Sequence, residues 1–122
     1  MHKARKLGIK LLVGTDTGNN SFTRHGELHA KELEIFVKHG GYTPMQAIVA
    51  ATRDNAFAVG LEGDVGEVAP GKLADIIVLR KDPLADITVL QGGRHLSWVI
   101  KDGRIVDLEP RDEMLMFQEA AE

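Results

Sequence analysis

Asp16 has the clearest chemical potential in this chain, because it closes an apolar run at Gly14-Thr15-Asp16. In α/β barrels, catalytic side chains project from the carboxyl ends of the strands. An Asp at such a position can bind a divalent metal and take a proton from metal-bound water. The same residue can instead cap a turn in a loop rich in Gly and Asn. Spacing alone favours the capping role, so both roles stay open for Asp16.

His25 and His29 form a second group with metal-binding potential. Zinc-protease motifs place a Glu directly after the first His or directly before the second. Here Glu27 lies between the two, and Gly26 weakens a helix that would have to present both imidazoles. We therefore expect exposed or capping histidines near the start of a helix, rather than a zinc site.

The apolar run before Asp16 predicts the strand that would position it. Ile9–Val13 is nearly continuous in apolar and β-branched residues. Such a run is typical of a strand covered on both faces, as in a parallel sheet. We expect this strand over residues 9–15, after a helix end at residues 3–8.

Three helices are expected next, over about residues 27–39, 43–51 and 53–59. The first has an apolar stripe at helical spacing that includes Leu33 and Phe36. The second begins with Thr43 as N-cap and Pro44 at the first helical position, and Gln46 completes a capping box.

After Gly60 the pattern changes to β-structure. A strand is expected over residues 74–79, and Asp102-Gly103 predicts a hairpin between Leu96–Lys101 and Arg104–Val106. We expect Asp75 to be buried and bonded to the backbone or to Lys72. Trp98 is expected in the core or in an interface.

These elements divide the chain into three parts and leave one strand without partners. Residues 1–60 form a strand–helix part, residues 61–110 a β part, and residues 111–122 a terminal helix. A buried strand needs neighbours on both edges, and parallel neighbours come from crossover units. The chain holds the end of one such unit. Another chain must supply the pairing, or this chain is a piece of a larger protein.

Composition narrows the class of protein. The 122 residues carry a net charge of −3, with 43% hydrophobic and 27% charged residues, which is typical of a globular domain. This charge does not favour nucleic acid or anionic membrane as a partner, and no apolar run reaches membrane-spanning length. Without cysteine the chain has no disulfide and no thiolate metal site. With no visible signal peptide, a cytoplasmic location is expected.

Several segments together resemble the C-terminal part of an amidohydrolase-superfamily enzyme of the imidazolonepropionase and prolidase-like group. The most specific is Gly66–Leu79, and the closing hairpin at Lys101–Val106 also matches. The others are Gly14-Thr15-Asp16, Thr43-Pro44-Met45-Gln46-Ala47, Ala50-Ala51-Thr52 and Gly60-Leu61. The resemblance covers about residues 5–107.

The resemblance implies a metal-bearing TIM-type (β/α)8 barrel with a small β-sandwich. In that family, hydroxide on one or two metals attacks an amide, lactam or related carbonyl. Asp16 takes the place of the general base and metal contact, and His25 that of a substrate contact. The other ligands of zinc or another divalent metal would lie before Met1. Because a catalytic zinc normally has three protein ligands, we expect the isolated chain to be inactive and to need no metal of its own.

Our leading hypothesis is the C-terminal part of a metal-dependent hydrolase acting on C–N bonds in a small amide, peptide, cyclic amide or dipeptide-like substrate. It would supply the last strand–helix unit of the barrel and the late strands of the sandwich. One alternative is a non-catalytic fragment that hides its strand edges in a homo-oligomer. Another is a subunit whose barrel is completed by a separate chain.

Overall fold

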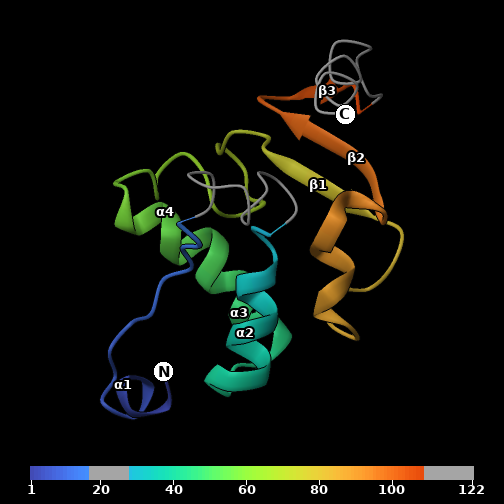
Figure 1. The fold of residues 1–122 in the computed structure, drawn as a ribbon. Helices are drawn as coiled ribbons and strands as arrows, with labels where there is room; N and C mark the ends of the chain where they lie inside the picture. The colour runs from blue at the N-terminus through green and yellow to red at the C-terminus, as the bar shows by residue number, and fades with distance from the viewer. Residues whose placement is uncertain (17–27, 109–122) are drawn as a thin grey trace, which may run out of the picture.

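The computed structural model describes residues 1–16 and 28–108. Figure 1 shows the helices of residues 2–58 on one side of the molecule, and on the other a small sheet with the short helix of residues 87–93 beneath it. Among the described residues, no helix is long and apolar enough to cross a membrane. In chain order the elements are α1 (His2–Lys6), α2 (Lys31–Gly40), α3 (Pro44–Val49), the π-helical turn η1 (Ala50–Asp54), α4 (Asn55–Ala58), β1 (Ile76–Leu79), the 3-10 helix η2 (Ile87–Gly93), β2 (Leu96–Lys101) and β3 (Arg104–Val106).

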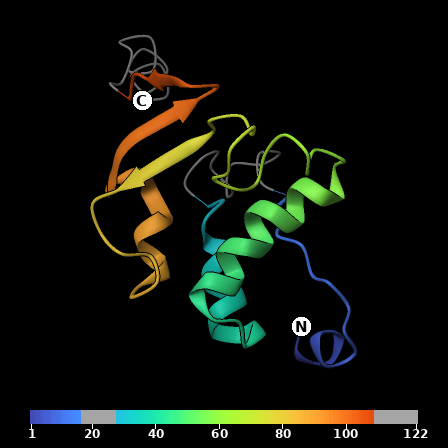
Figure 2. The ribbon, with the colours of Figure 1, turned by 180° about the vertical axis from the view of Figure 1, so that it is seen from behind.

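α3, η1 and α4 follow one another directly and form one continuous helical rod, which Figure 2 shows from the side. The predicted capping box is confirmed: Thr43 Oγ1 accepts from the Gln46 amide at 3.2 Å, and Gln46 Oε1 accepts from the Thr43 amide at 3.0 Å. The sequence predicted two helices with a break near Thr52. The rod instead continues through a π-turn, where the Thr52 hydroxyl donates to the Ile48 carbonyl at 2.8 Å.

The core lies where α2, the rod and η2 meet. Its buried members are Leu33, Phe36, Ala47, Ala50 and Ile87. The apolar stripe expected on the first long helix is thus confirmed at Leu33 and Phe36. The small alanine side chains leave room for close approach between helices, and this explains why two of them are among the most buried residues.

The sheet is antiparallel, in the order β1-β2-β3. The predicted hairpin is confirmed: Ile100 pairs with Ile105, and Lys101 with Arg104. Asp102 and Gly103 have φ values of 51° and 74°, as a two-residue hairpin turn of the primed type requires.

Asp75 differs from its prediction. It is exposed, and its carboxylate accepts from Lys101 Nζ at 2.7 Å and from the Asp102 amide at 2.8 Å. The expected backbone bond is therefore present, but the expected partner Lys72 is wrong. Lys72 turns instead into its own loop, where its ammonium donates to the carbonyls of Glu62 and Val65.

The expected strand over residues 9–15 is extended, but it is not part of the sheet formed by the described strands. Burial alternates along it, as in a strand: Leu11, Val13 and Thr15 are half-buried, and Leu12, Gly14 and Asp16 are exposed. In the described ranges no strand lies beside it, since the three strands pair only with one another. Coverage on both faces is not met within the described residues, because Leu12, Gly14 and Asp16 leave one face exposed. The parallel neighbours expected at its edges are also not among the described elements.

Two other expectations have different outcomes. Trp98, expected in the core or an interface, is 49% exposed on β2. The terminal helix expected over residues 111–122 lies outside the described residues.

The 3-10 helix η2 was not predicted. It begins after Asp86, whose carboxylate accepts from the Thr88 amide at 2.9 Å.

Candidate active site and family

Asp16 is the last residue of the extended segment that leads up to it. Its side chain is exposed, and its φ of 49° lies in the left-handed region, which Asp tolerates better than most residues. His29 is also exposed and lies just before α2, as predicted for a residue near a helix start. His25 lies outside the described residues.

A cavity of about 510 Å³ adjoins the segment that leads to Asp16. Most of its wall is apolar, with polar groups from Thr15, His29, Thr52 and Asn55. Its other lining residues are Val13, Gly14, Ala30, Leu33, Ile48, Ala51, Ile77, Leu79, Pro83 and Leu90. An apolar hollow with a few polar groups suits a small molecule, and it equally suits the side chains of another polypeptide.

A second hollow, of about 610 Å³, lies along the same rod. Its wall is also mainly apolar, and it shares five lining residues with the first: Ile48, Ala51, Thr52, Asn55 and Ile77. The face of the rod toward β1 is therefore open on both sides. Ile77 of β1 is 50% exposed there.

The segment that ends in Asp16 is fastened to the rod by side chains. Asn55 Nδ2 donates to the Val13 carbonyl at 2.8 Å, and Asn55 Oδ1 accepts from the Val13 amide at 3.1 Å. Lys10 lies 3.5 Å from the Asp54 carboxylate and 5.1 Å from the centre of the Phe57 ring. Sequence reasoning missed Asn55. A signal was present, because Asn is a poor helix former and needs a reason to occupy a helix.

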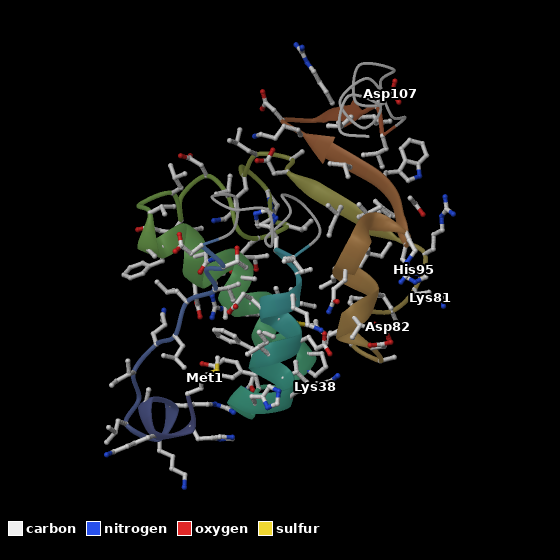
Figure 3. The ribbon with its side chains drawn as sticks, in the orientation of Figure 1. Met1, Lys38, Lys81, Asp82, His95 and Asp107 are labelled. Atoms are coloured by element: carbon white, nitrogen blue, oxygen red, sulfur yellow. The ribbon has the colours of Figure 1, made fainter. Side chains whose placement is uncertain are left out.

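The described residues do not by themselves fit a catalytic metal. Across residues 1–16 and 28–108, no three His, Asp or Glu side chains are grouped closely enough to hold one. Figure 3 shows ionisable residues spread over the molecule, with Lys38 on the helical side, Lys81, Asp82 and His95 near η2, and Asp107 at the far end of the sheet. Asp16 can supply one ligand of the three that catalytic zinc sites normally have.

Glu34 is a buried carboxylate with a structural role. It is 6% exposed and accepts hydrogen bonds from Lys31 at 2.6 Å, from Lys38, and from Gln91 at 2.7 Å. The bonds from Lys31, then Lys38 and Gln91, lower the pKa of Glu34 to about 2. A carboxyl with this pKa stays ionised near neutral pH and cannot serve there as a general acid.

Comparison with known proteins places the chain in a family. The model of the amidohydrolase family matches residues 1–106, almost the whole described part. The chain belongs to the amidohydrolase family. The resemblance seen in segments such as Gly66–Leu79 is therefore confirmed.

Individual amidohydrolases are similar over most of this chain. It is 37% identical over 103 residues to ochratoxinase of Aspergillus niger, which covers 84% of this chain and 20% of that protein. Imidazolonepropionase of Ralstonia nicotianae is 33% identical over 99 residues, covering 81% and 24%. The structure of a prolidase-like protein from Bifidobacterium longum superposes with a TM-score of 0.80 at 34% identity, covering 99% and 30%. The chain thus spans a fifth to a third of these relatives.

Proposed function

We propose that this amidohydrolase chain is the C-terminal part of a metal-dependent hydrolase that acts on C–N bonds. The chain would supply the last strand–helix unit of a (β/α)8 barrel and the late strands of a β-sandwich. The observation that carries the proposal is the strand-like segment that ends in Asp16 and lies beside no strand of the described residues. Its burial alternates as in a strand, and we infer that its neighbouring strands belong to polypeptide outside the described residues.

In this proposal Asp16 is the general base and a metal contact. Asp16 is exposed, so a water molecule can reach its carboxylate. His25 is assigned a substrate contact. Zinc or another divalent metal would need further ligands beyond the described residues, and the substrate would be a small amide, cyclic amide or dipeptide-like molecule. The isolated chain would be inactive, because a single carboxylate does not hold a catalytic zinc.

The test compares Asp16→Asn with Asp64→Asn in the intact enzyme. Asp64 is a matched control, because it is also an exposed carboxylate but lies in the loop after Leu61. We expect Asp16→Asn to lower kcat/KM on dipeptide or N-acyl substrates by roughly 10²- to 10⁴-fold, the usual contribution of a general base. Asp64→Asn should leave it unchanged. Near-normal turnover of Asp16→Asn would overturn the assignment.

A second candidate is a non-catalytic role in which the chain pairs with itself or with another chain that completes the barrel. It is favoured by the apolar side chains left exposed on the sheet, such as Ile77 at 50% and Ile105 at 62%. Closed homo-oligomers hide such surfaces economically. Both proposals include a cytoplasmic location, because a chain without cysteine forms no disulfide that would require an oxidising compartment.

A further inference from the structure

We propose that Asn55 is a positioning residue that takes the place of a neighbouring strand and holds the segment leading to Asp16 in register with the rod. The role of Asp16 in this inference rests on the proposed function. The fastening of Val13 by Asn55 stands on geometry alone.

The chemistry of the contact is that of a β-ladder. A side-chain amide has one acceptor oxygen and a donor NH₂, the same pair that a peptide group presents. Asn55 uses both toward one residue, donating to the Val13 carbonyl at 2.8 Å and accepting from the Val13 amide at 3.1 Å. A closely spaced pair of bonds to one residue is the pattern that antiparallel strands form with each other. Asp keeps only the acceptor, and Leu keeps neither group.

Because Val13 lies close to Asp16 in the chain, this contact also affects where Asp16 lies. Val13 lies three residues before Asp16, on the half-buried side of the extended segment. Because side chains alternate along such a segment, fixing both backbone groups of Val13 fixes the faces that Gly14 and Thr15 occupy, and so the point from which Asp16 projects. A shift of one residue in this register would turn Thr15 to the exposed face and displace the Asp16 carboxylate.

A π-turn in the rod sets the direction of the Asn55 side chain. The π-turn η1 (Ala50–Asp54) ends immediately before it. A π-turn holds an extra residue, so the side chains after it are rotated relative to those of an uninterrupted α-helix, and such turns are frequent at functional sites. The neighbours on the rod act on the same segment, since Asp54 and Phe57 both lie against Lys10.

The inference is tested by amide hydrogen exchange on the ¹⁵N-labelled 122-residue chain. The variants are Asn55→Leu, which keeps the shape and loses both bonds, and Asn55→Asp, which keeps the acceptor. Thr52→Ala is the control, because its hydroxyl bond to the Ile48 carbonyl stays within the rod. A lost hydrogen bond of ordinary strength corresponds to about five- to tenfold faster exchange.

We expect Val13 exchange to rise by that factor in Asn55→Leu and by less in Asn55→Asp. The resonances of Gly14, Thr15 and Asp16 should shift, and the Phe36 and Ala47 amides should keep their protection. Unchanged Val13 exchange would overturn the inference. So would equal acceleration at Val13 and Phe36, which would mean a general loss of stability.

A kinetic measurement in the intact enzyme then separates this inference from the proposed function. If Asp16 is the general base, Asn55→Leu should lower kcat while KM changes little. If the exchange result holds but Asp16→Asn leaves turnover normal, Asn55 fastens the segment and the assignment of Asp16 fails. If Asp16→Asn is inactive but Val13 exchange does not respond to Asn55, the positioning role fails alone.

Discussion

Glu34 of α2 accepts a hydrogen bond from Gln91 of η2 at 2.7 Å, which joins two residues 57 positions apart in the sequence. Lys31 and Lys38 donate to the same carboxylate from within α2. The group is nearly inaccessible to solvent yet has three donors around it, so the negative charge is compensated where it is buried. The bond from Gln91 thereby joins η2 to α2.

This contact predicts how stability depends on pH. The pKa of Glu34 is lowered from 4.5 to about 2 in the folded chain, first by the hydrogen bond from Lys31. Between these values the unfolded chain binds the proton more readily than the folded one. The contribution of Glu34 is therefore present above about pH 4.5 and is lost as the pH falls through about 2.

Urea unfolding of the chain and of Glu34→Gln from pH 7 to pH 2 checks this. We expect Glu34→Gln to be less stable at pH 7, and the difference to shrink toward zero near pH 2. Glu32→Gln, two positions earlier on the same helix, is the control. Its free energy of unfolding should depend on pH as that of the unmodified chain does. A difference that stays constant over the whole range would contradict the prediction.

Gly66 predicts a steric effect on stability. Its φ is 92°, and a Cβ there would lie 2.9 Å from the Ala56 Cβ, 3.0 Å from the Arg53 Cα and 3.1 Å from the Thr52 carbonyl oxygen. Two of these are backbone atoms of the rod that cannot move aside easily. We expect Gly66→Ala to lower the free energy of unfolding by about 1–3 kcal/mol, measured by chemical denaturation.

Gly63→Ala is the matched control for Gly66→Ala. A Cβ at Gly63 would meet nothing within 4 Å. It also has no positive φ, so alanine should be neutral or slightly stabilising there. If both variants lose the same free energy of unfolding, the close contact between Gly66 and the rod is not the reason that glycine is needed there.

The capping box at the start of α3 predicts a separate, smaller effect. Removing the Thr43 hydroxyl leaves the Gln46 amide without its acceptor at 3.2 Å. Thr43→Ala should therefore cost about 1 kcal/mol in thermal unfolding, whereas Thr43→Ser should keep most of the stability. If serine and alanine cost the same, the hydroxyl bond is not the stabilising contact.

The exposed apolar wall around Ile77 predicts self-association of the isolated chain. Ile77 borders both hollows along the rod and is half exposed. We expect sedimentation velocity to show a mass above that of the monomer, rising with concentration. Ile77→Lys should weaken this association more than Ile105→Lys, which is on β3 and borders neither hollow. A single monomeric mass at all concentrations would count against the prediction.

The ligand set predicts weak retention of metal. Within the described ranges no three carboxylate or imidazole groups come together, so the dialysed chain should hold well below one zinc per molecule by elemental analysis. Stoichiometric zinc that is lost in Asp16→Asn would contradict this. It would indicate a site that includes Asp16 with His25 and His29, within one chain or between two.

The elements that could be predicted are those decided by neighbouring residues. The capping box depends on Thr43 and Gln46, and the hairpin depends on two residues, Asp102 and Gly103, that accept left-handed backbone. The apolar stripe of α2 follows from helical periodicity alone. In each case the interacting groups lie within a few positions of one another, so residue type and spacing are sufficient.

Prediction was weaker where the partner of a residue lies far along the chain. Asp75 was expected to be buried and to bond the backbone or Lys72. It does bond a backbone amide, that of Asp102, but it is exposed and its side-chain partner is Lys101, 26 positions away. The break expected near Thr52 is absent, and the helix continues there through a π-turn. The bond between Asn55 and Val13 spans 42 positions, so an Asn within a helix could signal that a partner exists but could not identify Val13 as that partner.

The sequence by itself determined the family and most of the helices and strands, because these depend on residue type and short spacing; Asp16 became the candidate base through the family resemblance. Only the tertiary structure decided that residues 9–15 are extended with no strand of the described residues beside them, and that Asn55 bonds both backbone groups of Val13. The physical reason is that a strand is defined by its partner. Residue pattern sets the alternation of buried and exposed side chains, but only the assembled chain shows which groups meet its backbone.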